Sequence, residues 1–198
     1  RAASQIMANL PYVKGVRIGI KLPDTVNIMI EEESVVYAIK SSDGQWWMMD
    51  SDGRVVEQAN NAKAATATQV LGVTLEAPTV NEKGVATEMT PSETNELGEL
   101  IPVSTTGAQR LTAALQILKA LENNDIVGEA ASVDVTSTED IILWYGTRYQ
   151  VNLGDTSRLD YKVDCMNDAI LQMSDYQSGV LDISFTIWPN QVGYTPFA

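Results

Sequence analysis

The sequence predicts an α+β fold in which two long helices cover one face of a mainly antiparallel sheet. Short runs of alternating β-branched and aromatic residues recur along the chain, and turns rich in Gly, Pro and Asp separate them. Two segments, 106–123 and 157–173, instead repeat apolar residues at helical spacing. The 198 residues, of which 44% are hydrophobic, suffice for one ordinary core and a small accessory module.

The first part of the chain predicts a short helix followed by a β-hairpin. Residues 1–10 place apolar side chains at helical spacing. Pro11 cannot continue the helix, which is therefore expected to end near Asn9. Segments 16–20 and 26–30 alternate in the manner of strands, and the Lys-Leu-Pro-Asp sequence between them favours a turn.

A three-stranded meander is expected next, from runs at 35–39, 46–49 and 55–56. Two Ser-Asp-Gly triplets, at 42–44 and 51–53, separate these runs and are typical of hairpin turns. The second triplet resembles a fragment of a calcium loop, but the remaining oxygen ligands are not at the required spacing. We therefore interpret both triplets as turns.

A polar stretch at 79–100 interrupts the strand pattern, and its many Glu, Thr, Pro and Gly residues predict a flexible acidic loop. Thr106 and Gln109 then form a capping-box signature, and the leucine stripe that follows predicts an amphipathic helix ending near Asn123. The later elements are expected to be strands at 132–135, 141–145 and 149–153, a helix at 157–173, a strand at 179–185, a turn at 188–190 and a last extended segment at 192–197.

Composition argues against several classes of function. Thirteen basic and 26 acidic residues give a net charge of −13, which repels nucleic acid and anionic membranes. The chain has no histidine, so a Ser-His-Asp triad, a Cys-His pair and a conventional zinc site are excluded within it. The single cysteine, Cys165, is expected to be an inert thiol on a buried helix face. No apolar run approaches the ~20 residues of a membrane span, and no signal peptide opens the chain.

Several segments together resemble the extracytoplasmic part of the FtsQ/DivIB family of bacterial cell-division proteins. Their order and spacing, more than any one of them, carry the resemblance. The matching segments are Leu10-Pro11-Tyr12-Val13, 23–32, 36–39, 49–55, 72–78, 151–154, Tyr161-Lys162, 179–185 and 194–196.

The resemblance implies a truncated POTRA module at residues 1–33 and a family-type β domain at 34–198. It implies a non-enzymatic scaffold of the divisome, without a cofactor, that helps to regulate septal peptidoglycan synthesis. It further implies an extracytoplasmic location at the division septum and a cell-membrane anchor formed by one helix before Arg1. The implied partners are the small division proteins of the DivIC/FtsB and FtsL types.

In this family the partner adds a strand to the last strand of the β domain. Strand addition uses unpaired backbone groups of a sheet edge, and aromatic side chains commonly anchor such interfaces. A β-rich segment at the carboxyl end of the chain suits that mode. The corresponding partner-binding residues are Ser184, Phe185, Thr186, Ile187, Gly193 and Tyr194.

Other interpretations of these features stay open at the level of sequence. Phe185 can instead be a core residue of an ordinary strand, and Tyr194 can be a stacking residue that closes the domain. Exposed tryptophans would suit a cell-wall or polysaccharide-binding module, although Trp46, Trp47 and Trp144 also suit core or half-buried positions. A carboxylate-based hydrolase would require two acidic side chains that face each other in a deep cleft.

Overall fold

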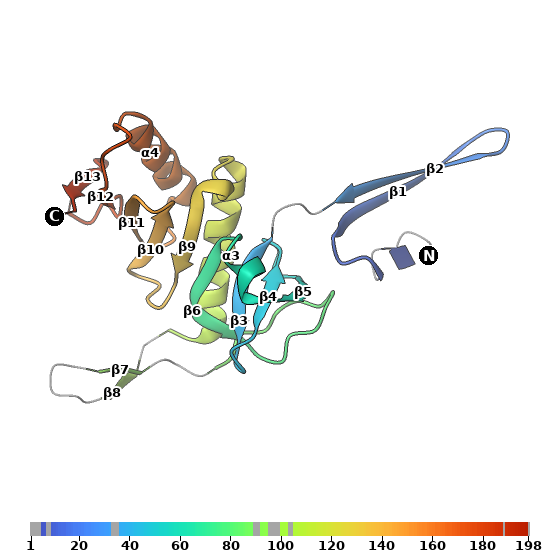
Figure 1. Cartoon of the computed structure of the whole chain (residues 1–198), viewed down its shortest axis with the longest axis horizontal. Coiled ribbons are helices and arrows are strands. Elements are labelled where there is room, and N and C mark those ends of the chain that lie inside the picture. Colours follow the sequence, from blue (N-terminus) through green and yellow to red (C-terminus); the bar gives the residue numbers. More distant parts are fainter. Residues whose placement is uncertain are drawn as a thin grey trace.

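A computed structural model describes residues 5–6, 9–32, 36–88, 92–94, 100–102, 105–187 and 189–197 of the chain. Figure 1 shows a large sheet with helices packed against it, and a hairpin that projects from it. The strands are β1 (Val13–Lys21), β2 (Thr25–Glu32), β3 (Tyr37–Ser41), β4 (Trp46–Met49), β5 (Val55–Ala59), β6 (Gln69–Leu75), β7 (Ser92–Thr94), β8 (Leu100–Pro102), β9 (Ala130–Asp134), β10 (Ile141–Tyr145), β11 (Tyr149–Gly154), β12 (Gly179–Asp182) and β13 (Gly193–Pro196). The helices are α2 (Asn61–Ala64), α3 (Gly107–Asn123), the 3-10 turn η1 (Val127–Glu129) and α4 (Leu159–Leu171).

Nine strands form the main sheet in the order β13-β12-β11-β10-β9-β6-β3-β4-β5. The pairs β3–β6, β6–β9 and β11–β12 are parallel, and the other pairs are antiparallel. Two small antiparallel pairs, β1–β2 and β7–β8, lie outside this sheet. The predicted α+β fold with a mainly antiparallel sheet and two long helices is therefore confirmed.

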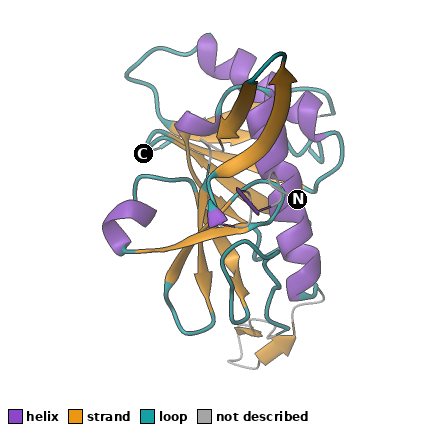
Figure 2. Ribbon diagram, turned by 90° about the vertical axis from the view of Figure 1, so that its right-hand side faces the viewer, coloured by secondary structure: helices purple, strands orange, loops and turns teal. Residues whose placement is uncertain are grey.

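The main core lies between one face of the sheet and the helices α3 and α4, which Figure 2 shows on the same side of the strands. Leu111, Ile117 and Leu118 of α3 are buried against inward residues of the sheet, such as Val133 and Leu143. The predicted capping box of α3 is present, because the Thr106 hydroxyl accepts from the Gln109 N–H and the Gln109 side chain accepts from the Thr106 N–H.

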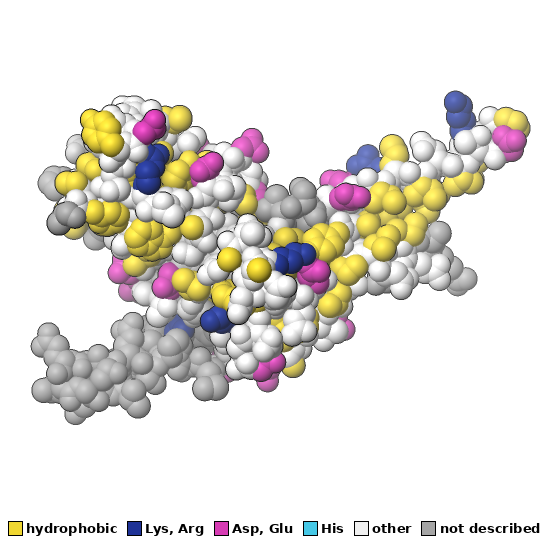
Figure 3. All heavy atoms as spheres, in the orientation of Figure 1, with side chains coloured by type: hydrophobic (Ala, Val, Ile, Leu, Met, Phe, Trp, Pro, Cys, Tyr) yellow, Lys and Arg dark blue, Asp and Glu magenta, His cyan; other side chains and the backbone are white. Residues whose placement is uncertain are grey.

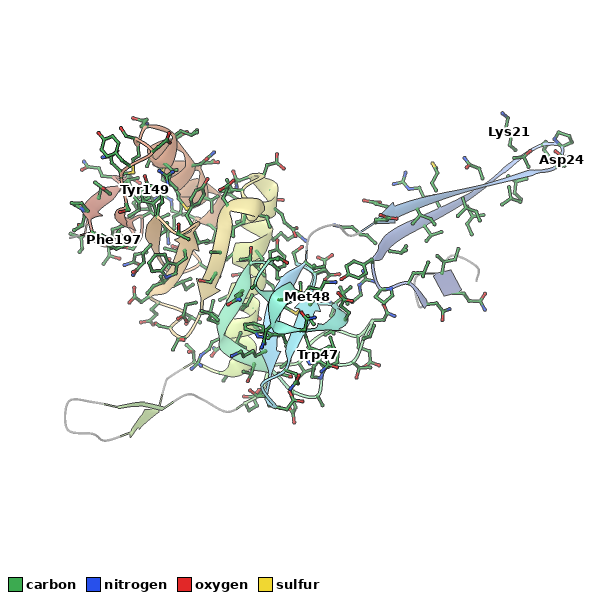
Figure 4. All side chains as sticks on the ribbon, in the orientation of Figure 1. Lys21, Asp24, Trp47, Met48, Tyr149 and Phe197 are labelled. Carbon is green, nitrogen blue, oxygen red and sulfur yellow. The ribbon has the colours of Figure 1, made fainter. Side chains whose placement is uncertain are left out.

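The hairpin β1–β2 confirms the predicted pair of strands near the amino end. Its register places Val16, Ile18 and Ile20 opposite Ile30, Ile28 and Val26, so one face of the hairpin consists of β-branched side chains. Most of these side chains are exposed. A two-stranded sheet of this kind is marginally stable alone. Lys21 and Asp24 lie at its distal tip, far from the main sheet (Figure 4).

The base of the hairpin is attached to the main sheet through Tyr12. Its hydroxyl donates to Glu57 of β5 (2.5 Å), and the Lys63 ammonium contacts both groups. The Tyr12 ring also packs against the small second core cluster beside α2. The expected short helix before this point falls largely outside the described residues.

The structure differs from two expectations, the burial of Cys165 and the flexibility of the loop at 79–100. Cys165 is half-buried on α4, not fully enclosed, because its side chain lies at the margin of the stripe formed by Val163, Met166 and Ile170. Residues 79–88 of the expected flexible loop are hydrogen-bonded to the sheet. The Thr87 N–H donates to the Thr74 carbonyl oxygen (2.9 Å), for example. Most of the remaining loop, including 89–91 and 95–99, lies outside the described residues.

A buried lysine joins the end of β11 to the first turn of α4. The Lys162 side chain is 1% exposed, and its ammonium donates to the carbonyl oxygens of Leu153 and Asp155 and to the Asp155 carboxylate, each at 2.8 Å. A buried ammonium requires such a complete set of acceptors, because an unpaired buried charge is strongly unfavourable. Lys162 therefore fixes where α4 begins.

We expect Lys162→Met to lower the free energy of unfolding by about 1–3 kcal/mol, because a buried carbonyl group loses its donor. Urea unfolding followed by circular dichroism would measure this change. Lys119→Met is the matched control: Lys119 is exposed and pairs with exposed Asp52, so the change should stay within about 0.5 kcal/mol. Equal stability of the two variants would contradict the role assigned to Lys162.

The contact between Lys162 and Asp155 makes the free energy of unfolding depend on pH. Hydrogen bonds from Lys162 and Ser157 lower the pKa of Asp155 from 3.8 to about 2. Between about pH 4 and about pH 2 the unfolded chain binds more protons at this group than the folded chain, so stability falls as the pH falls. Asp155→Asn should remove this part of the slope in urea unfolding, whereas Asp140→Asn in the exposed β9–β10 turn should retain it.

Candidate partner-binding edge

The nine-stranded sheet has two edge strands, β5 and β13, and their outer backbone groups differ in how they are paired. At β5 the Val55 N–H donates to the Glu82 carbonyl oxygen and the Asn81 N–H donates to the Val55 carbonyl oxygen, both at 2.8 Å. The Gly84 N–H also donates to Gly53 (2.8 Å), so segment 81–84 covers the start of this edge. At the other edge, no strand of the described part of the chain pairs with the outer side of β13.

The register of β13 shows which of its backbone groups face outward. The Phe197 N–H donates to the Ser178 carbonyl oxygen (3.1 Å), and β12 and β13 then run antiparallel with Thr195 opposite Val180. Because bonded and non-bonded pairs alternate in an antiparallel ladder, Thr195 and Gly193 direct their backbone groups toward β12. Tyr194 and Pro196 direct theirs to the open side. The edge thus presents a donor and an acceptor at Tyr194 and an acceptor alone at Pro196, which has no N–H.

The side chain of Tyr194 is committed to the domain itself. It is half-buried against the main core, and its hydroxyl donates to the Ser178 carbonyl oxygen (3.1 Å). Its ring lies over Gly179, where an added Cβ would lie 2.8 Å from the ring and 2.3 Å from the Thr195 carbonyl oxygen. The interpretation of Tyr194 as a residue that closes the domain is therefore supported, while its backbone stays available at the edge.

The expected strand through Ser184, Phe185, Thr186 and Ile187 is wrong. β12 ends at Asp182, whose carboxylate accepts from the Ser184 N–H (3.0 Å) and the Ser184 hydroxyl (2.7 Å). Such an Asx turn competes with continued strand pairing. The Asp-Ile-Ser sequence at 182–184 was the signal for this turn. Ser184 and Phe185 are half-buried in the connection to β13, and Thr186 and Ile187 are exposed there.

Phe185 packs against the start of α4 and not at the sheet edge. Its backbone is left-handed, with φ of 59°, and its ring lies 5.6 Å from that of Tyr161. The Arg158 guanidinium lies over both rings, at 4.4 Å from Tyr161 and 5.6 Å from Phe185, and donates to the Asn190 side chain (3.0 Å). This cluster fixes the connection between β12 and β13. Of the six residues that the resemblance assigned, only Gly193 and Tyr194 lie on the edge strand.

Phe197 is a candidate contact that the sequence interpretation did not include. It follows β13 directly, is 43% exposed and stacks on Trp144 of β10, with ring centroids 6.2 Å apart. Figure 4 shows it at the outer end of the domain, beside β12 and β13, and Figure 3 shows several separate hydrophobic groups on the surface of this end. Alternation along Tyr194-Thr195-Pro196-Phe197 was the available signal, because it places Phe197 on the sheet face opposite to the Tyr194 ring.

The three tryptophans that the structure describes, Trp46, Trp47 and Trp144, are engaged within the chain. Besides the Trp144 stack, Trp47 donates its indole N–H to the Ser41 hydroxyl (3.1 Å), and the Lys40 ammonium lies 4.9 Å from the Trp46 ring centroid. All three side chains are half-buried.

Acidic side chains do not converge in the surface hollows. Of four hollows lined by described residues, two contain one carboxylate each, from Glu129 and Asp160, and two contain none. Within the described ranges no group of three His, Cys, Asp or Glu residues is arranged to hold a metal ion. None of the described helices has the length and apolar character needed to cross a membrane.

Comparison with known proteins identifies relatives that function in cell division. The chain is 25% identical over 185 residues to a protein of Clostridium tetani named cell division protein DivIB, and the alignment covers 92% of this chain and 62% of that protein. It is 34% identical over 65 residues to a protein of the same name from Clostridium acetobutylicum, covering 33% of this chain and 26% of that protein. The chain thus spans less than two thirds of either relative. No family model matches it.

Gly179 provides a test of how β13 is held. We expect Gly179→Ala to displace β13 and to lower the free energy of unfolding by about 1–3 kcal/mol, because the added methyl group meets backbone atoms. Hydrogen exchange at the Thr195 amide should accelerate as well. Gly128→Ala is the matched control, since an added Cβ there meets nothing within 4 Å. Unchanged exchange at Thr195 in Gly179→Ala would show that this close approach does not hold β13.

Proposed function

Since its relatives support assignment to the DivIB/FtsQ family of cell-division proteins, we propose that this chain is a non-enzymatic divisome scaffold that binds a partner polypeptide by strand addition at β13. The partners are small division proteins of the DivIC/FtsB and FtsL types. The folded part lies outside the membrane at the septum, next to a membrane anchor, and helps to regulate septal peptidoglycan synthesis. In this proposal residues 1–33 are a partial POTRA module and residues 34–198 are the family's β domain.

The open backbone of β13 is the observation that carries this proposal. Tyr194 and Pro196 turn donor and acceptor groups outward, while the start of the opposite edge is covered by segment 81–84. A visiting strand that pairs with these groups extends the sheet and gains main-chain hydrogen bonds with little dependence on its own sequence. Such an edge needs either protection or a partner.

The contacts proposed for the partner follow from the placement of the side chains. Tyr194 and Pro196 contribute outward backbone groups, Gly193 lies on the same strand with its backbone toward β12, and Phe197 contributes an aromatic surface on one face of the edge. Exposed Thr186 and Ile187 flank the strand in the connection before it. Ser184 and Phe185 act indirectly in this proposal, because they hold the connection against α4.

Titration of a purified DivIC/FtsB-type extracytoplasmic segment by calorimetry tests the proposal. We expect Phe197→Ala to weaken binding by about tenfold or more, as an interface anchor would, while the fold stays intact because the ring is exposed. The matched control is Val85→Ala, which removes an exposed apolar side chain beside the covered edge and should leave affinity unchanged.

Replacement of Tyr194 by its α-hydroxy acid examines the backbone directly. This change exchanges the outward N–H for an ester oxygen and keeps the ring, so we expect affinity to fall by about threefold to tenfold, as for one hydrogen bond. Equal affinities for the wild type, Phe197→Ala and the Tyr194 ester would refute binding at β13, as would the absence of binding by any of them.

A further inference from the structure

The connection from β12 to β13 has little packing of its own. Beyond buried Ile183, every described residue of 186–191 is exposed. Among these described residues, only Asn190 has a side-chain hydrogen bond to another element, which it accepts from the Arg158 guanidinium (3.0 Å). Val192 then packs partly against the main core. The path of the chain into β13 therefore depends on a small number of contacts.

One arginine at the start of α4 contacts both ends of this connection. The Arg158 guanidinium lies over the Phe185 ring near the first end, with 5.6 Å between them, and donates to the Asn190 side chain near the second end. It also lies 4.4 Å from the centroid of the Tyr161 ring, which packs against that of Phe185. These four residues, Arg158, Tyr161, Phe185 and Asn190, form a latch between α4 and the connection.

The backbone of the latch is unfavourable without these contacts. Arg158, Phe185 and Asn190 are all left-handed, with φ of 55°, 59° and 56° respectively. Asn adopts this region readily, but in Arg and Phe the Cβ approaches the following carbonyl oxygen. The attraction between a guanidinium and a partly exposed ring is weak, so it offsets this backbone cost with little to spare. The ordered connection is therefore favoured by a small margin.

The two ends of β13 are held in different ways. At the carboxyl end, the Tyr194 hydroxyl and the Phe197 N–H both donate to the Ser178 carbonyl oxygen. At the amino end, Gly193 pairs with Asp182, the last residue of β12, so its position depends on the connection before it. Loss of the latch would therefore release β13 from its amino end, while the remainder of the sheet keeps its pairing.

We propose that Arg158 is a positioning residue that sets the fraction of molecules in which β13 is ordered and ready to accept a partner strand. The guanidinium acts through Phe185 and Asn190, which hold the connection, and not through contact with the partner. Its effect on binding rests on the proposed strand addition at β13, whereas its effect on the free protein does not. A partner that pairs only with the ordered strand binds with an affinity reduced in proportion to that fraction.

Hydrogen exchange in the free protein tests the latch without any partner. We expect Arg158→Met to accelerate exchange of the Thr195 amide, which faces β12, by about threefold, because the strand opens more often when the guanidinium is lost. Asn190→Gly should act in the same direction, since Gly adopts the left-handed region freely and the change removes the acceptor. The Leu143 amide, in a strand paired on both sides, should not change. Unchanged exchange at Thr195 in both variants, or equal acceleration at Leu143, would overturn the proposal.

Binding kinetics with a DivIC/FtsB-type extracytoplasmic segment test the consequence for the edge. Arg158→Met should lower the association rate constant by about twofold to threefold and leave the dissociation rate constant unchanged, because the bound strand is the same in both proteins. Lys119→Met removes an exposed cation of α3, away from the connection, and is the matched control that should change neither constant. Faster dissociation with unchanged association would overturn the positioning role. Absence of binding by the wild type would refute strand addition, and the exchange measurement would then decide the role of Arg158 alone.

Discussion

The open edge depends on the close seating of β13 against β12. Only four residues of β13 pair with β12, so the strand needs further attachment. The Ser178 carbonyl oxygen provides it by accepting from both the Tyr194 hydroxyl and the Phe197 N–H, each at 3.1 Å. Gly179 allows this, because any side chain there would occupy the space of the Tyr194 ring. The Tyr194 side chain holds the strand from inside, and its backbone is thereby left facing outward.

Asp-x-Ser/Thr turns at the carboxyl ends of strands shape the same end of the sheet. Asp134, Asp155 and Asp182 each accept from the N–H and the hydroxyl of the residue two positions later. They follow or end β9, β11 and β12 respectively. Each turn replaces further strand pairing with a local hydrogen bond, which is the competition expected of Asp in such positions. As a result, β9, β11 and β12 end at the same side of the sheet, and the connections to β10, α4 and β13 begin there.

Local signals predicted much of the fold. The hairpin, the meander, the capping box at Thr106 and the two long helices all rest on short-range patterns, and the structure contains them. Sheet order was beyond the sequence, because the parallel pairing of β6 with β3 and β9 joins segments far apart in the chain. The strand predicted at 179–185 extends too far, because the Asp182 turn ends β12 although the alternation of apolar residues continues beyond it. The pairing of segment 81–84 with the start of β5 was likewise not predicted, because it depends on backbone hydrogen bonds between segments separated along the chain.

Helix α4 supports the connection that leads to the edge strand. Lys162 fixes the helix to the end of β11, and one turn earlier Arg158 holds the Phe185 ring and the Asn190 side chain of the connection to β13. Arg158 also borders a surface hollow between α3 and the start of α4. Arg158 thus ties the connection before β13 to the helix that Lys162 fixes to β11, so the position of the edge strand depends on the seating of α4.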